Sequence, residues 1–92
     1  MNTILISYDL NGYESSQSYT NLINAIKKYS SWAKPLESFW LVKTNQTTEE
    51  VREALKPYLD ANDEIMTVNV TGCAWSTHGV PKNITDWFYA NM

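Results

Sequence analysis

The residue best placed to do chemistry is Asp9, at the end of a short β-rich run over residues 3–10. Side chains alternate along a strand, so Asp9 shares a face with Leu5 and Ser7. The opposite face is apolar and can lie under helices; it carries Ile4, Ile6 and Tyr8. A strand-end carboxylate could help to hold Mg²⁺ or Mn²⁺, whose preferred ligands are oxygen atoms. The simpler interpretation is that Asp9 caps the turn at Asn11-Gly12.

Four other residues carry groups that could take part in chemistry. Tyr8 and Ser38 could contact a phosphate on the substrate side, although core packing also accounts for Tyr8 and a backbone hydrogen bond also accounts for Ser38. His78 has no second histidine or cysteine at ligand spacing, so we interpret it as an exposed loop residue. Cys73 has no histidine at a recognisable spacing, so we interpret it as a small buried side chain.

The helices that must position these residues follow from hydrophobic spacing and capping signals. A first helix is predicted after Ser18, its expected N-cap, and a second follows Thr47, which forms a capping box with Glu50. Pro57 should tighten the last turn of the second helix, and a closing helix starts at Pro81.

Strands are predicted over residues 3–10, 37–44 and 64–71. Residues 30–36 form a turn or an edge strand, because Pro35 has no backbone N–H to donate. The 37–44 strand is apolar on both faces, so either a helix covers one face and a partner sheet the other, or the strand is central to a packed interior. The last strand is expected to point its apolar side chains inward: Met66, Val68 and Val70.

This order of elements predicts an α+β fold, a ferredoxin-like split βαβ sandwich with a short C-terminal appendix, in one domain over residues 1–92. Helices would cover one face of the sheet and leave the other bare. Small domains of this kind often hide such a face by pairing sheet to sheet, so we expect a homodimer. The four Trp and six Tyr residues also favour an interface, although an aromatic-rich core with surface tyrosines accounts for them too.

Charge and cysteine content narrow the function classes. Ten acidic against seven basic residues give a net charge of −3, whereas indiscriminate nucleic-acid binding requires a basic face. One cysteine excludes an intrachain disulfide and fits a reducing cytoplasm. No stretch approaches the length of a membrane span, and the N-terminal run is typical of a strand and not of a signal peptide. We therefore expect a cytoplasmic protein with no membrane partner.

Several motifs are spread over essentially the whole chain: Tyr8-Asp9-Leu10, Ser38-Phe39-Trp40, Trp40-Leu41-Val42-Lys43, Leu55-Lys56-Pro57, Asp60-Ala61-Asn62-Asp63-Glu64, and Thr71-Gly72 with a nearby Trp75. Together they resemble the CRISPR-associated Cas-two proteins and the related VapD-like endoribonucleases. Within that superfamily the chain is most similar to short bacterial SinR-like proteins.

The resemblance implies a ferredoxin-like homodimer in which Asp9 of each protomer comes near its twin across the two-fold axis. In those proteins the matching aspartate is assigned to divalent-metal binding in phosphodiester cleavage, so the implied activity is that of a weak endonuclease using Mg²⁺ or Mn²⁺. Arg52 is the one arginine here, whereas family members that hold nucleic acid carry arginines around the second strand.

Two other hypotheses stay open. The first is a non-catalytic dimeric protein-interaction module, whose contact would be made by exposed aromatic residues such as Trp32, Trp75 and Trp87. The second is a mobile-element inhibitor of a defence system, a role in which small acidic chains also serve.

Overall fold

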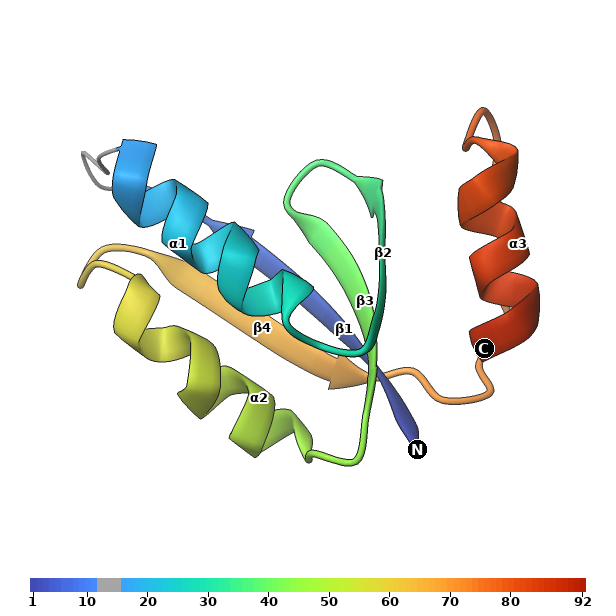
Figure 1. Ribbon diagram of the computed structural model, residues 1–92, viewed down its shortest axis with the longest axis horizontal. Helices are drawn as coiled ribbons and strands as arrows, with labels where there is room; N and C mark the ends of the chain where they lie inside the picture. Colours follow the sequence, from blue (N-terminus) through green and yellow to red (C-terminus); the bar gives the residue numbers. More distant parts are fainter. Residues whose placement is uncertain (12–15) are drawn as a thin grey trace.

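The computed structural model describes residues 1–11 and 16–92, with side chains described for 1–11 and 19–92. The elements in chain order are β1 (Asn2–Asp9), α1 (Ser16–Lys27), β2 (Ser31–Leu36), β3 (Phe39–Thr44), α2 (Thr48–Leu55), the 3₁₀ helix η1 (Lys56–Tyr58), β4 (Glu64–Asn69) and α3 (Lys82–Asn91). In the described part of the chain, the strands form one sheet in the order β2-β3-β1-β4, and each neighbouring pair is antiparallel. The predicted ferredoxin-like α+β fold is confirmed (Figure 1).

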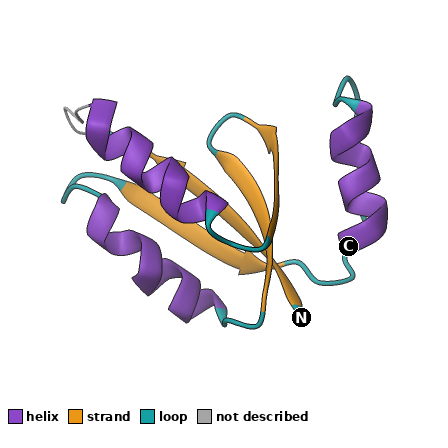
Figure 2. Cartoon of the chain, viewed as in Figure 1, coloured by secondary structure: helices purple, strands orange, loops and turns teal. Residues whose placement is uncertain are grey.

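The helices lie on both sides of the sheet. Figure 2 shows α1 and α2 together on one face and α3 apart from them, beside β2. The predicted inner face of β1 is confirmed, because its apolar side chains pack under α1 and α2 in the main core. That core consists of Ile4, Ile6, Tyr8, Leu22, Ile26, Trp40, Val42, Val51 and Leu55. No helix in the described ranges combines the length and apolarity needed to cross a membrane.

One hydrogen bond inside this core joins two strands through their side chains. The indole N–H of Trp40 on β3 donates to the Tyr8 hydroxyl on β1 at 3.1 Å. Both residues are almost completely buried, so the bond satisfies polar groups that are shielded from water. Burial raises the pKa of Tyr8 above its ordinary value of 10.0, and the bond from Trp40 offsets part of that rise.

The sequence predicted that the second face of the sheet is bare. This prediction is wrong, because the C-terminal part of the chain folds over the β2–β3 half of that face. The Lys43 ammonium donates to the Asn91 carbonyl at 2.6 Å, and the buried Thr3 hydroxyl donates to the same oxygen at 2.8 Å. A cation at the end of a helix also interacts favourably with its dipole. Four residues earlier in α3, the Trp87 indole donates to the Ser31 hydroxyl, next to Lys43 in the sheet, at 2.9 Å. The apolar second face of β3 is therefore covered, at least in part, by the protein's own C-terminal helix.

The prediction that Met66 and Val68 of β4 point into the core is wrong. Met66 is 58% exposed and Val68 is 37% exposed, whereas Ile65 packs against the core. The pairing explains the inversion: Tyr8 lies opposite Ile65 and Leu5 lies opposite Val68, and paired residues share a face of the sheet. A shift of one residue reverses every side chain in a strand, and the apolar face of β1 decided which side became the core.

The helix boundaries are mostly as predicted. The helix α1 begins at Ser16, so Ser18 lies inside the helix and is not its N-cap. Pro57 tightens the end of α2 into η1, as predicted. The capping box is also confirmed, with the Thr47 hydroxyl accepting from the Glu50 N–H at 3.1 Å and the Glu50 carboxylate accepting from the Thr47 N–H at 3.0 Å.

The capping box should contribute measurably to stability. We expect Thr47→Ala to lower the free energy of unfolding by about 1 kcal/mol, because the Glu50 backbone N–H at the start of α2 loses the hydroxyl that accepts its hydrogen bond. The change is measured from urea unfolding followed by circular dichroism. Thr47→Ser keeps the hydroxyl and serves as the control. Equal stability of the Ala and Ser variants would contradict this role.

Two tyrosines with raised pKa values, the buried Tyr8 and the partly buried Tyr29, should make the fold sensitive to alkali. Burial also raises the pKa of Tyr29 above 10.0. A raised pKa in the folded state means that stabilisation is complete below the unfolded value and is lost as pH rises through the folded value. We therefore expect the urea midpoint to fall above about pH 10, and to fall less steeply in a variant that combines Tyr8→Phe and Tyr29→Phe.

The quantity to compare is the slope of the urea midpoint against pH, because Tyr8→Phe also removes the acceptor for the Trp40 indole N–H and lowers stability at every pH. Tyr89→Phe is the matched control, since Tyr89 is 80% exposed. Identical slopes for the wild type and the double variant would show that these hydroxyls do not govern alkaline unfolding.

Candidate functional site

Asp9 lies at the last position of β1, directly opposite Glu64, the first residue of β4. Both residues are exposed, and the alternation of the two strands places both on the face away from α1 and α2. We call Asp9 and Glu64 the carboxylate pair. Like charges directly opposite one another on neighbouring strands repel, so a cation bound between them would relieve the repulsion.

The neighbouring loop fixes one member of this pair. The Asn11 side-chain amide donates to Glu64 Oε1 at 3.0 Å, and the Asn11 backbone N–H donates to Asp63 Oδ1 at 2.9 Å. Asp63 Oδ2 accepts from the backbone N–H of Asp60 at 2.7 Å. The simpler interpretation was that Asp9 caps the turn at Asn11-Gly12. In the structure Asp63 accepts the hydrogen bond from the Asn11 N–H, and Gly12 lies outside the described residues.

The donor set of the carboxylate pair suits a hard divalent cation. Carboxylate oxygens are typical ligands of Mg²⁺ and Mn²⁺, and Mg²⁺ keeps several of its waters when it binds. Among residues 1–11 and 16–92, no group of three or more His, Cys, Asp or Glu side chains is placed to hold a metal ion. A metal site here would therefore draw on Asp9, Glu64, water and groups from a second protomer.

The two predicted substrate-side residues take different positions. The Tyr8 side chain is 4% exposed and its hydroxyl is bonded within the core, so it lies on the opposite face of the sheet from Asp9. Ser38 lies in the turn between β2 and β3, and its carbonyl accepts from the Tyr8 N–H at 3.3 Å. The structure therefore brings the Ser38 turn beside the end of β1 but keeps Tyr8 away from the carboxylates.

The Ser38 turn has an unusual backbone conformation. Its φ angle is +54°, in the left-handed region that non-glycine residues adopt with some strain. Strained residues of this kind persist only where the surrounding structure holds them. Here the bond from the Tyr8 N–H and the pairing of Leu36 with Phe39 hold the turn.

Cys73 and His78 are both exposed. The exposure of His78 agrees with its interpretation as a loop residue, whereas the prediction that Cys73 is buried is wrong. Gly72, with a φ of +69°, turns the chain away from the sheet after β4, so Cys73 leaves the sheet before a second layer can cover it.

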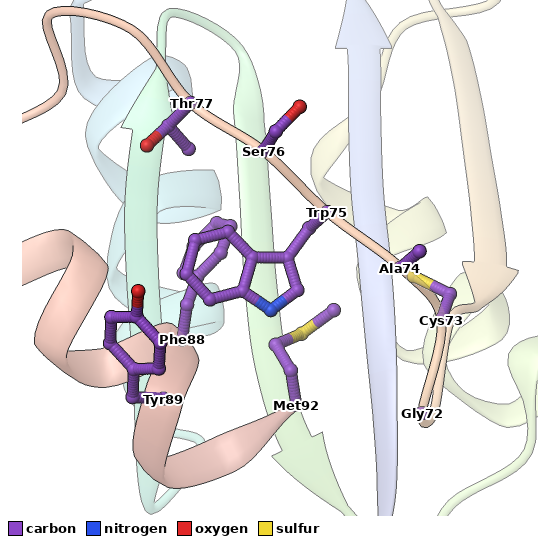
Figure 3. Close-up of a pocket in the computed structure, with 9 residues that line it drawn as sticks. All are labelled: Gly72, Cys73, Ala74, Trp75, Ser76, Thr77, Phe88, Tyr89 and Met92. Carbon is purple, nitrogen blue, oxygen red and sulfur yellow. The ribbon is translucent and has the colours of Figure 1, made fainter.

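The candidate contact aromatics are largely engaged within the chain. Figure 3 shows the Trp75 ring beside Phe88 and Tyr89; its centroid is 4.8 Å from that of Phe88 and 5.0 Å from that of Tyr89. Trp87 is bonded to Ser31. Trp32 is 38% exposed, with the Lys27 ammonium 5.3 Å from its ring centroid. Trp75 and Trp87 thus help to fasten the C-terminal segment.

An apolar surface remains on the β1–β4 half of the second face. We call it the open patch; it consists of Leu5, Met66 and Val68. Met66 and Val68 are exposed, and Leu5 is half-buried. The carboxylate pair borders the patch, since Glu64 precedes Met66 by two residues along the same face of β4. Sequence reasoning missed Glu64 as a neighbour of Asp9. The available signal was that the last residue of β1 lies beside the first residue of β4 if the two strands pair antiparallel.

Comparison with known proteins bears on the fold. No protein-family model matches this chain. Among solved structures, the chain is similar to a hypothetical protein TT1823 from Thermus thermophilus, with a TM-score of 0.64 and 18% sequence identity. The match covers 87% of this chain and 94% of the other. At this level of identity the likeness supports the shared ferredoxin-like fold.

Proposed function

We propose that this chain is a small homodimeric protein of the CRISPR-associated Cas-two and VapD-like type, with weak metal-dependent endonuclease activity at its carboxylate pairs. The observation that carries the proposal is the position of Asp9. Its carboxylate is exposed at the end of the central strand β1, opposite Glu64 and at the border of the open patch. The motif resemblance around Tyr8-Asp9 and the ferredoxin-like fold support the same proposal.

The open patch supports the dimer. Met66 is 58% exposed and Val68 is 37% exposed, on neighbouring outward positions of an edge strand. Apolar side chains grouped on an uncovered sheet face are typical of interaction sites. A second copy placed on this patch would bury it and bring the ends of two β1 strands, with their carboxylates, towards one axis.

In this dimer, Asp9 and Glu64 of each protomer would hold Mg²⁺ or Mn²⁺. A bound ion of this kind supplies Lewis acidity and a water of lowered pKa, which are the requirements of phosphodiester hydrolysis. Asn11 keeps Glu64 Oε1 oriented through its amide. The chain has a net charge of −3, so substrate phosphates would be attracted mainly through the metal, and RNA or DNA binding should be weak without it.

The endonuclease proposal is tested with labelled single-stranded RNA and DNA and the full chain. We expect cleavage with Mg²⁺ or Mn²⁺, none with EDTA, and a loss of about a hundredfold or more in Asp9→Asn and Glu64→Gln, because each substitution removes a negative ligand. Asp86→Asn is the matched control, since Asp86 pairs with Lys82 on α3. Cleavage that survives both site substitutions, or none in the wild type, would overturn the catalytic proposal.

A non-catalytic dimeric interaction module is the second candidate, and the lysines of the sheet favour it. Lys34 lies on the helix side, 5.5 Å from the Trp40 ring centroid. Lys43 lies on the second face, but its ammonium is bonded to the Thr3 hydroxyl and the Asn91 carbonyl. The strands therefore present no unengaged lysine or arginine on the face that carries Asp9, as a groove for nucleic acid would require.

Both candidates need the dimer, which can be tested separately. We expect light scattering to give twice the protomer mass at micromolar concentration. The Met66→Lys/Val68→Lys double variant should raise the dissociation constant of the dimer about a hundredfold, because the new charges would be buried in the interface. Tyr89→Lys changes an exposed aromatic residue outside the patch and should leave the mass unchanged. A wild type that is monomeric at this concentration would contradict both candidates.

A further inference from the structure

A cavity of about 350 Å³ lies between the sheet and the C-terminal part of the chain, away from the carboxylate pair. The β2–β3 strands supply one wall through Leu36, Phe39 and Leu41. Residues 70–81, which we call the strap, cross over this wall and supply Trp75, while α3 supplies Phe88. Leu41 and Phe88 are almost completely buried at the cavity, whereas Leu36 is 58% exposed and forms its lip.

Contacts within the chain hold the strap and α3 in place over the cavity, so these walls do not need a bound ligand to keep their position. Edge contacts hold Trp75 to Phe88 and Tyr89, and Figure 3 shows the three rings side by side. The C-terminal half of α3 is held by the bonds to the Asn91 carbonyl and from the Trp87 indole. A pocket walled by such fixed parts is pre-formed, which is the usual condition of small-molecule sites.

The walls define the charge of a ligand. Apart from His78, the described side chains that line the cavity are uncharged: Pro35, Leu36, Phe39, Leu41, Val70, Cys73, Trp75, Ser76, Thr77, Val80, Phe88 and Met92. An ammonium group placed among these walls loses its hydration without gaining an acidic side chain as its partner, and a carboxylate would find only the exposed His78 among the described lining residues. Polar groups come from the strap, where Ser76 and Thr77 supply hydroxyls. A ligand that fits is therefore neutral and apolar, with one hydroxyl or carbonyl group.

The volume defines the size of a ligand. An apolar cavity of about 150 Å³ accommodates benzene, and pockets for small molecules begin at about 300 Å³. A space of about 350 Å³ therefore suits two fused rings or a branched aliphatic molecule of similar size. We propose that the cavity under the strap is a binding site for a neutral, apolar molecule of this size that carries a single hydroxyl or carbonyl group.

The experiment uses the full chain and two probes of matched shape, neutral 2-naphthol and anionic 2-naphthoate. Binding is followed by NMR, through the Leu41 methyl groups and the Trp75 indole N–H, with the core residue Leu22 as reference. We expect saturable shifts at the cavity with a dissociation constant below about 1 mM for 2-naphthol, and binding at least about tenfold weaker for 2-naphthoate.

Two variants locate the site. Leu36→Trp fills the exposed lip and should weaken 2-naphthol binding about tenfold or more, whereas Val68→Trp places the same ring on the open patch and should leave binding unchanged. Leu36 and Val68 are both exposed, so both variants should keep the fold, which circular dichroism checks. The absence of saturable binding, shifts confined to the open patch, equal binding of the two probes, or equal effects of the two variants would overturn the proposal.

Discussion

The structure depends on the pairing of β1 at the centre of the sheet. This strand bonds to β3 on one side and to β4 on the other, and paired residues point to the same face. Ile4, Ile6 and Tyr8 therefore decide which face of every neighbouring strand joins the main core. The same alternation sends Asp9 to the other face, so the core and the candidate site are two consequences of one strand.

The second face shows how a small domain manages a two-sided apolar sheet. A chain of 92 residues buries a limited share of its surface, so each covered apolar residue contributes appreciably to its stability. The strap and α3 cover the β2–β3 half, with Lys43 and Thr3 bonded to the end of α3. The β1–β4 half keeps the open patch, so the C-terminal helix leaves one half of this face uncovered and forms one wall of a cavity on the other half.

Much of the fold could be predicted from the sequence because its signals are local. Thr47 and Glu50 lie three residues apart, as a capping box requires, and Pro35 could only occupy an edge position in the sheet. The alternation of residues 4–9 assigned both faces of β1 correctly. In β4, the same kind of local pattern pointed the wrong way, because Met66 and Val68 are apolar yet lie on the second face.

The sequence by itself determined the order of elements, the inward face of β1 and the strand-end position of Asp9, since each follows from neighbours a few residues apart. Only the tertiary structure decided that Glu64 lies opposite Asp9, that Tyr8 bonds to Trp40 inside the core, and that α3 covers half of the second face. These facts join residues dozens of positions apart in the chain. Pairing register and long-range packing set them, and neither leaves a periodic mark in the sequence.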